Sequence, residues 1–268
     1  MVIFIDLDGT LLYDGNVSQR NRKAIKKTQE QGNIVVLCTA RPLSRFVGLM
    51  DEMGIRYAIA GSGAVIYDRL EDKLLFKKTI DADEVDKILK LMKKNDFISL
   101  FCTGQQAYSN SSFLRDYDKI SQRVKVLGNI EDLILKNREN IVSFIPHSFD
   151  FDSLHELYKQ AIKDGLNVTG ASKAIVEGGG RPRSSYYVEI APRGLSKGTG
   201  VDFILDHLGA DSNNAIAIGD GYNDIEMFKR VKTSVAMGNC VPGLLGFAMH
   251  RTLSNQDDGV AVFLESLG

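Results

Sequence analysis

Two aspartates near the start of the chain, Asp6 and Asp8, directly follow a short apolar run at residues 2–5. The run shows no helical period and contains β-branched residues, so it predicts a buried strand that ends at the aspartates. Side chains two residues apart on an extended chain point the same way, and open α/β sheets bind ligands at the carboxyl ends of their strands. Two carboxylates this close repel each other unless a cation or a shared proton intervenes. The pair indicates either a cation site or a solvated turn after an edge strand.

Other polar groups also stand where predicted strands end or helices begin. Thr39 follows a second apolar run, Lys197 begins a predicted helix, and the polar turn 219–224 follows a third apolar run. If these strands are parallel, all of the groups reach the same edge of the sheet as the two aspartates. Alone, Thr39 is more simply a helix cap and Lys197 a solvated surface residue. Occurring together and in this order, the groups favour one site.

The carboxylates that converge on that edge cannot all stay ionised without compensation. A divalent cation with oxygen ligands supplies it, and Mg²⁺ usually binds one or two carboxylates together with a substrate phosphate. Lys197 offers a positive charge to a phosphate, while the Thr39 hydroxyl and the backbone N–H groups near Gly9 and Ala40 can hold phosphate oxygens. These groups provide the charge, positioning and oxygen nucleophile that phosphoryl transfer requires.

The elements that must position these groups alternate between strand and helix. Apolar runs alternate with amphipathic segments in the first third of the chain, and the same alternation returns near its end. The predicted strands are 2–5, 34–38, 57–60, 215–218 and 234–237. The predicted helices are 19–31, 42–53, 198–207 and 225–230. This spacing is typical of an α/β protein with a doubly wound, mainly parallel (Rossmann-like) sheet.

The order of predicted strands and helices changes between these two regions. Val85, Ile88, Leu89 and Met92 form the apolar stripe of an amphipathic helix, and hairpin-like strand pairs, helices near 113–122 and 153–163, and a glycine-rich connector at 178–183 follow. Such a pattern is typical of an α+β unit with a mainly antiparallel sheet. We therefore predict a discontinuous core domain, residues 1–80 and 191–268, with an α+β cap domain, residues 81–190, inserted into it.

Composition limits the kinds of molecule that we expect the protein to bind. The formal net charge is −1, which provides no basic surface for nucleic acid, and no run approaches the ~18 apolar residues of a membrane span. Cys38, Cys102 and Cys240 are far apart and lack metal-ligand spacing. They favour reduced thiols, and so a cytoplasmic protein that acts on a small molecule and binds neither nucleic acid nor membrane.

In order and spacing, the segment 6–10, Thr39, Lys197 and the segment 219–224 resemble the four motifs of the haloacid dehalogenase superfamily. The large insert, with the tail segments 235–239 and 255–260, resembles the Cof-type branch of that superfamily. The resemblance implies a Mg²⁺-dependent phosphatase that hydrolyses small phosphorylated metabolites, sugar phosphates first, through an aspartyl-phosphate.

The resemblance also implies roles for single residues. Asp6 would be the nucleophile, and Asp8 would protonate the leaving alcohol and later deprotonate water. Mg²⁺ would be held by Asp6, the backbone carbonyl of Asp8 and Asp220, with Asp224 supporting directly or through water. The phosphoryl oxygens would be bound by Thr39, Lys197 and Asn223, together with the backbone at Gly9 and Ala40.

Three residues near these motifs are possible substrate contacts. Arg41 could reach the substrate or pair with Asp51 on the following helix. Ser62 stands, beside Gly63, where Cof-like chains often have asparagine, so a contact usually made by an amide is in doubt. Two other functions fit the same motifs, a phosphotransferase or phosphomutase and a non-catalytic Mg²⁺-binding switch module.

Overall fold

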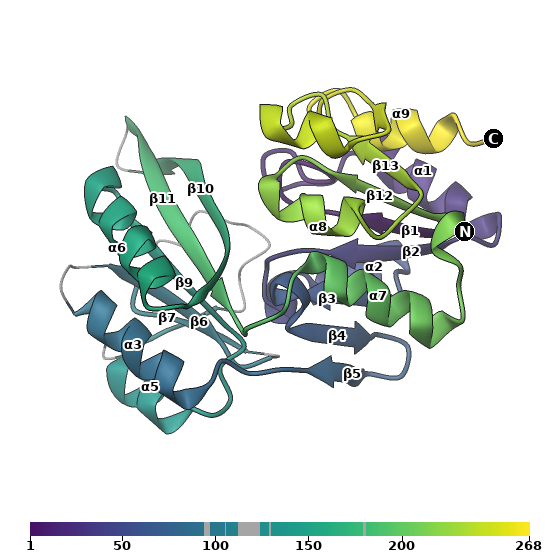
Figure 1. Ribbon diagram of the computed structural model, residues 1–268. Helices are drawn as coiled ribbons and strands as arrows, with labels where there is room; N and C mark the ends of the chain where they lie inside the picture. The colour runs from purple at the N-terminus through teal and green to yellow at the C-terminus, as the bar shows by residue number, and fades with distance from the viewer. Residues whose placement is uncertain (94–96, 105, 112–123, 129, 179–180) are drawn as a thin grey trace. The chain divides into compact units, whose positions relative to one another are not determined.

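The computed structural model describes residues 1–93, 97–104, 106–111, 124–128, 130–178 and 181–268 (Figure 1). The chain forms two compact units, which we describe separately. The first comprises Met1–Ala40, Val47–Leu75 and Leu195–Gly268, and the second comprises Arg41–Phe46 and Phe76–Gly194. The ranges proposed from the sequence for a core and a cap domain stay a prediction. The helix predicted near 113–122 lies outside the described residues.

The first unit is built on a twisted sheet with the strand order β14-β13-β12-β1-β2-β3-β4-β5. Its strands are β1 (Val2–Ile5), β2 (Ile34–Cys38), β3 (Tyr57–Ala60), β4 (Val65–Asp68), β5 (Lys73–Lys77), β12 (Ala215–Gly219), β13 (Thr233–Ala236) and β14 (His250–Arg251). Neighbours from β14 to β3 pair in parallel, and β4 is antiparallel to β3. The doubly wound, mainly parallel sheet predicted from the sequence is confirmed.

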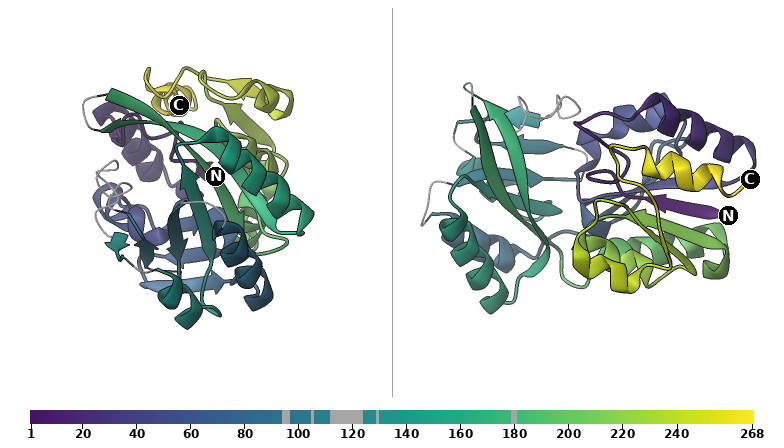
Figure 2. Two further views of the ribbon diagram at one scale, coloured as in Figure 1. Left: turned by 90° about the vertical axis from the view of Figure 1, so that its left-hand side faces the viewer. Right: turned by 90° about the horizontal axis from the view of Figure 1, so that it is seen from above.

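Helices cover both faces of this sheet (Figure 2). The helices α1 (Gln19–Glu30), α2 (Val47–Met53) and α9 (Gly259–Glu265) lie on one face, and α7 (Lys197–Leu208) and α8 (Ile225–Phe228) on the other. Short 3-10 turns connect the elements: Leu43–Arg45, Gly61–Gly63, Ser212–Asn214, Tyr222–Asp224 and Pro242–Phe247. Because both faces are covered, β1 is buried along its whole length, as its unbroken apolar run predicts.

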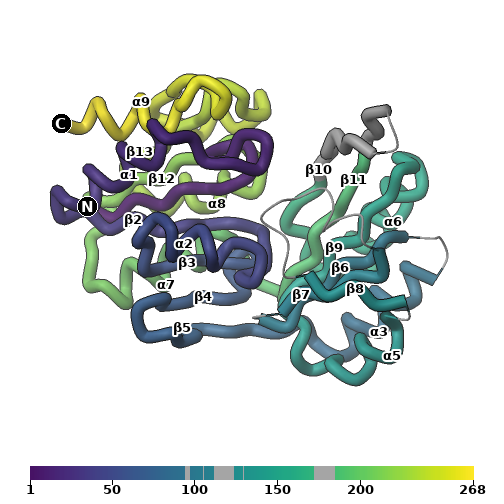
Figure 3. Tube along the Cα trace, turned by 180° about the vertical axis from the view of Figure 1, so that it is seen from behind, coloured from purple at the N-terminus to yellow at the C-terminus, as the bar shows by residue number. Residues whose placement is uncertain are grey.

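The second unit contains a six-stranded sheet with the order β10-β11-β9-β6-β7-β8. Its strands are β6 (Ile98–Cys102), β7 (Ala107–Ser109), β8 (Val124–Val126), β9 (Ser143–Ser148), β10 (Asn167–Gly178) and β11 (Arg181–Ala191). All pairs are antiparallel except β7 with β8. The helices α3 (Ala82–Met92), α5 (Glu131–Lys136) and α6 (Phe151–Lys163) pack on one face, around a core that includes Val85, Ile88 and Phe144 (Figure 3).

One predicted connection in this unit is wrong. The glycine-rich segment 178–183 is expected from the sequence to be a flexible connector, but Gly178 ends β10, residues 181–183 begin β11, and Gly178 pairs with Arg181, while residues 179 and 180 lie outside the described residues. Cross-strand pairing extends from Asn167–Ala191 to this point, with one register shift between Val168 and Gly170, and it satisfies the backbone groups, which outweighs the poor strand propensity of glycine. Among the residues that the structure describes, no helix has the length and apolarity needed to cross a bilayer.

Candidate active site

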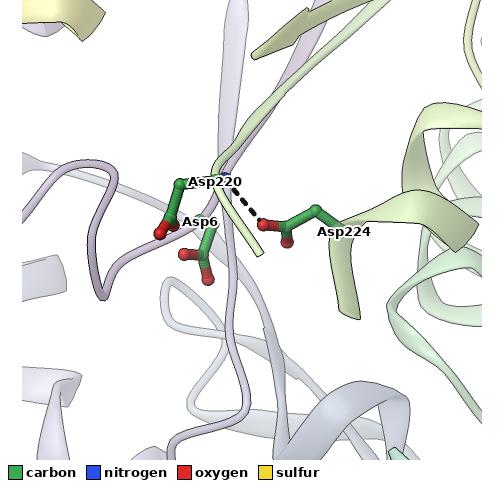
Figure 4. Close-up of side chains that lie close together, drawn as sticks. All are labelled: Asp6, Asp220 and Asp224. Carbon is green, nitrogen blue, oxygen red and sulfur yellow. Dashed lines mark hydrogen bonds between the residues drawn. The ribbon is translucent and has the colours of Figure 1, made fainter. Parts of the chain in front are cut away.

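The pairing of two central strands brings distant aspartates together. β1 and β12 are parallel neighbours in register, with Ile5 opposite Ile218, and the N–H group of Asp6 continues the ladder by donating to the Ile218 carbonyl (3.0 Å). Asp6 directly follows β1, and Asp220 directly follows β12. Both side chains therefore stand at the carboxyl edge of the sheet, where Figure 4 shows their carboxylates close to that of Asp224.

Three carboxylates form a compact cluster at this edge. Each of Asp6, Asp220 and Asp224 offers an oxygen, and these oxygens lie within 4.8 Å of one another. Asp6 and Asp224 are buried, and Asp220 is half-buried. The Thr10 hydroxyl donates to Asp220 Oδ1 (2.9 Å), which fixes the rotamer of that carboxylate. The cluster has the hard oxygen donors that divalent cations of the Mg²⁺ and Ca²⁺ type bind.

A buried lysine at the start of α7 joins the cluster. Lys197 Nζ lies 2.6 Å from Asp6 Oδ1 and 2.6 Å from Asp224 Oδ1. Lys197 is the first residue of α7, whose N-terminus is held by a capping box between Ser196 and Thr199. The next residue, Gly198, lets α7 approach α8 closely, because a Cβ at this position would lie 2.4 Å from the Glu226 carbonyl oxygen.

Asp224 has both of its carboxylate oxygens engaged. Oδ1 accepts from Lys197, and Oδ2 accepts from the N–H groups of Asp220 and Gly221, both at 2.9 Å. Asp224 therefore holds the turn that carries Asp220 and also orients the lysine. This arrangement fits a supporting role for Asp224 better than direct ligation of a metal.

Burial and mutual repulsion shift the ionisation of the cluster. Burial raises the pKa of Asp6 well above its ordinary value, and the charges of Asp224, Asp220 and Asp8 add to this effect against the opposing charge of Lys197. Burial and the neighbouring Asp224 raise the pKa of Asp220 to about 7. Burial alone would lower the pKa of Lys197, but Asp224 and Asp6 together raise it well above its ordinary value. One lysine does not neutralise this many carboxylates, so the site fits an additional cation.

The loop that carries Asp8 passes directly beside Asp220. Gly9 has φ +79°, and a Cβ on it would lie 2.2 Å from Asp220 Oδ2, so only glycine fits at this position. Asp8 is exposed, which fits the proton-transfer role predicted for it. Its charge contributes to the raised pKa values of both Asp6 and Asp220, which places it near them.

Two asparagines from the end of the chain brace this loop. Asn239 Nδ2 donates to the Gly9 carbonyl (2.8 Å), and the Asn239 Oδ1 atom accepts from the N–H group of Asn255 (2.9 Å). Asn255 Nδ2 in turn donates to the Leu12 carbonyl (2.7 Å). The sequence leaves open whether Asn255 and Asp258 brace the site or cap the last helix. The structure shows the brace for Asn255, because the N-cap residue of α9 is Asp258.

The remaining predicted residues in the first unit line the same edge or the turns near it. Thr39 directly follows β2, is buried, donates its N–H to the Ile59 carbonyl (2.8 Å) and accepts from the Ser62 N–H (3.1 Å). Ala40 follows it. Ser62 and Gly63 form a tight turn, with Ser62 at φ 52°, that contacts the N-terminus of α7.

The roles predicted for single residues remain predictions, although the geometry gathers several of them. Asp6, Asp220, Asp224 and Lys197 form one cluster, and Asn223 lies half-buried in the turn between Asp220 and Asp224. Arg41 belongs to the second unit. Asp51, which the sequence offers as an alternative partner of Arg41, pairs with Arg69. The substrate contact of Arg41 also stays a prediction.

Sequence reasoning missed two contributors, Thr10 and Asn239. Both stand inside the motifs that carry the family resemblance, but that resemblance gave neither of them a role. Thr10 donates to Asp220 across 210 positions of sequence, and Asn239 to Gly9 across 230. Short motifs contain no information about such distant partners, so only their place beside the acidic residues could have drawn attention to them.

Comparison with known proteins adds to this geometry. Residues 3–264 match the family described as haloacid dehalogenase-like hydrolase. The chain is 27% identical to the 5-amino-6-(5-phospho-D-ribitylamino)uracil phosphatase YwtE of Bacillus subtilis, covering 99% of this chain and 97% of that protein. It is 28% identical to the phosphatase YwpJ of the same organism, covering 99% of each. The fold is similar to that of a haloacid dehalogenase-like hydrolase from Bacteroides thetaiotaomicron, with a TM-score of 0.81 and 24% identity over 100% of this chain and 99% of the other.

Proposed function

Because the chain belongs to the family of haloacid dehalogenase-like hydrolases and is a phosphatase, we propose that it hydrolyses small phosphorylated metabolites with the help of Mg²⁺. The observation that carries this proposal is the buried bridge of Lys197 between Asp6 and Asp224, beside Asp220. Such a site concentrates one fixed positive charge and several oxygen ligands around a carboxylate that can attack phosphorus.

Sugar phosphates and related phosphorylated polyols are the proposed substrates. Three Bacillus subtilis relatives are phosphatases of 5-amino-6-(5-phospho-D-ribitylamino)uracil, a phosphate ester on a ribityl chain. These relatives are 24–27% identical to this chain. At that distance the shared chemistry supports the class of substrate, a phosphate ester of a small hydroxylated alcohol, and not the same compound.

The reaction is proposed to pass through an aspartyl-phosphate. An Asp6 oxygen forms a bond to phosphorus while the bond between phosphorus and the substrate alcohol breaks, and Asp8 gives its proton to the departing alkoxide. Asp8 then removes a proton from water, the water oxygen bonds to phosphorus, and the Asp6–phosphorus bond breaks to release inorganic phosphate. Lys197 offsets negative charge throughout, from its position 2.6 Å from Asp6.

The carboxylates of the cluster fit Mg²⁺, since the donors are hard oxygens and carry more negative charge than Lys197 neutralises. Asp6 and Asp220, with the Asp8 carbonyl, would hold the ion, and Asp224 would support it. When bound, Mg²⁺ would withdraw charge from the phosphoryl oxygens. Thr39, Asn223 and the backbone at Gly9 and Ala40 are proposed to bind these oxygens.

The predicted domains are part of the same proposal. A core domain of residues 1–80 and 191–268 would carry the chemistry, and the inserted domain of residues 81–190 would act as a cap that selects the leaving group and excludes water. Arg41, Ser62 and Gly63 are proposed substrate contacts. The proposed location is the cytoplasm, which the free thiols of Cys38, Cys102 and Cys240 favour.

A panel of phosphorylated metabolites assayed with Mg²⁺ tests the proposal. Wild-type protein should release phosphate from sugar or polyol phosphates, and Asp6→Asn should lose at least about 10³-fold in kcat with its fold retained. Asp206→Asn, an exposed aspartate of α7, is the matched control and should behave as wild type. Near-normal turnover by Asp6→Asn would exclude Asp6 as the nucleophile. Measuring isomer formation on the same substrates separates hydrolysis from the phosphomutase alternative.

A further inference from the structure

The first turn of α7, which carries Lys197, has glycine at two positions that face a neighbouring element. Gly198 contacts α8, and Gly200 contacts β3. A Cβ on Gly200 would lie 2.5 Å from the Cγ2 atom of Ile59, whose side chain is fully buried. Real Cβ atoms essentially never lie within 3.0 Å of such a neighbour, so no side chain fits between this turn and β3.

The turn Gly61–Gly63 contacts the same end of α7 from another side. Gly63 has φ +99°, and a Cβ on it would lie 2.3 Å from the carbonyl oxygen of Ser196, the N-cap residue of α7. The turn is also bonded to Thr39, whose carbonyl accepts from the Ser62 N–H group at 3.1 Å. One tight turn therefore joins the end of β2 to the start of α7.

The end of β2 and the start of α7 also meet directly. The Sγ atom of Cys38, the last residue of β2, lies 4.0 Å from the Lys197 carbonyl oxygen, and both residues are buried. Lys197 is therefore held through the residues before and after it and through its own carbonyl. Its ammonium group, 2.6 Å from Asp6, belongs to a backbone that cannot shift without moving β2, β3 or α8.

We propose that Gly63, Gly198 and Gly200 are positioning residues of the phosphatase reaction, because they set the distance between Thr39 and the Lys197 ammonium group. This inference rests on the proposed function, in which both groups bind oxygens of one phosphoryl group. A Cβ at any of the three positions would displace the start of α7 by at least about 0.5 Å to restore a 3.0 Å contact. Misplacing a reacting group by about 1 Å can cost roughly 10²-fold in rate. Gly63 has this task in addition to its proposed substrate contact.

Gly63→Ala and Gly61→Ala form a matched pair within one turn. Both glycines have a positive φ, +99° and +54°, so both substitutions carry a backbone cost, but a Cβ on Gly61 makes only an ordinary contact with Ala64 at 3.6 Å. Gly63→Ala should lower kcat roughly 10- to 100-fold and change KM less than about 3-fold, because it displaces groups that act in the transition state. Gly61→Ala should keep the wild-type kcat. Both constants are measured with Mg²⁺ on p-nitrophenyl phosphate and on the panel ester that the wild type hydrolyses best.

Gly200→Ala allows a rescue that a loss of stability alone would not produce. Its kcat should fall roughly 10-fold or more, although alanine is the better helix former, because the new Cβ meets the Ile59 side chain. Ile59→Ala removes the atoms of that contact and should by itself keep kcat near wild type. The double variant should regain kcat to within about 3-fold of wild type while staying less stable than wild type. Gly48→Ala, on α2 with open space at its Cβ position, is the control and should leave kcat unchanged.

Thermal denaturation shows which variants are folded at the assay temperature, and the Gly200 and Ile59 set decides the inference even if Gly63→Ala does not fold. Wild-type kcat in Gly63→Ala and Gly200→Ala would overturn the inference and leave the proposed function intact. A folded double variant as slow as Gly200→Ala would also overturn it, since displacement by the Cβ would then not explain the loss. A wild type that releases no phosphate from any of these esters would overturn the proposed function, and the inference with it.

Discussion

The buried polar groups of the aspartate cluster in the first unit are charged and bonded to one another, whereas two buried polar groups on the sheet of the second unit, His147 and Ser185, are neutral and make no hydrogen bond among the described residues. Lys197 contacts Asp6 and Asp224 at 2.6 Å. The difference has an energetic meaning. The charges of the first unit compensate one another in place, whereas each buried polar group without a partner in the second unit carries a cost of roughly 1–3 kcal/mol that the rest of the fold must offset.

The largest expected effect comes from removing Lys197, the cation that compensates the buried carboxylates of the first unit. Lys197→Met should lower the free energy of unfolding by about 3–5 kcal/mol in the metal-free protein, because it leaves buried carboxylates without their cation. Turnover should fall below detection in the same variant. Urea denaturation and phosphate release measure the two effects. Added Mg²⁺ should recover part of the stability but not the activity, and equal stability of variant and wild type would show that the buried bridge contributes nothing.

Substitution of Gly9 tests the close contact between its backbone and the Asp220 carboxylate. Gly9→Ala should lower kcat at least about 10-fold and the free energy of unfolding by about 2–3 kcal/mol, since the new Cβ meets Asp220 at a backbone conformation that alanine disfavours. Gly54→Ala is the matched control, because Gly54 also has a positive φ but open space around its Cβ position. It should show the backbone cost of about 1 kcal/mol with normal kcat. Equal behaviour of the two variants would contradict the close contact.

The buried neutral ring of His147 in the second unit should be detectable in the pH dependence of stability. The folded pKa of His147 is lowered to about 3, below the ordinary value of 6.5, so the unfolded chain binds a proton that the folded one does not. Wild-type stability should therefore be intact above pH 6.5 and fall by up to about 1.4 kcal/mol per pH unit as the pH drops from 6.5 toward 3. His147→Gln should remove this slope. Urea denaturation at several pH values measures it, and parallel curves for both proteins would contradict the buried neutral ring.

The smallest expected effect concerns the asparagine brace on the loop that carries Asp8. Asn239→Ala should lower kcat roughly 3- to 10-fold with little change in KM, and lower the free energy of unfolding by about 1 kcal/mol, because it frees the Gly9 carbonyl. Asn33, whose side chain donates to the Thr28 carbonyl at 3.0 Å, is the control. Asn33→Ala should cost similar stability and leave kcat unchanged. A KM effect without a kcat effect would point away from positioning of the loop.

Much of the first unit could be predicted because its signals are local. Buried parallel strands appear as unbroken apolar runs, and the residues that follow them must stand at one edge of the sheet, so the sequence was enough to place Asp6, Thr39 and Asp220 there. The contacts that complete the site could not be predicted from the sequence. The bonds from Thr10 to Asp220 and from Asn239 to Gly9 join positions more than 200 residues apart.

The second unit was harder to predict, since its long hairpin depends on pairing between segments that are individually weak strand formers. The chain from 167 to 191 contains glycine, serine and charged residues, a composition that favours short strands separated by a connector. Cross-strand hydrogen bonds, which no single segment can make alone, hold it as β10 and β11. Antiparallel sheets with mixed composition depend on such context.

The amino-acid sequence by itself determined the family, the alternation of strands and helices and the acidic residues at the strand ends, because each depends on neighbouring positions. Tertiary structure alone decided that Lys197 bridges Asp6 and Asp224, and that His147 and Ser185 share one buried face. A shift of one residue in the register of β9 against β11 would move His147 to the opposite face from Tyr187. Register between distant strands is set by the folded sheet as a whole, and no local pattern contains it.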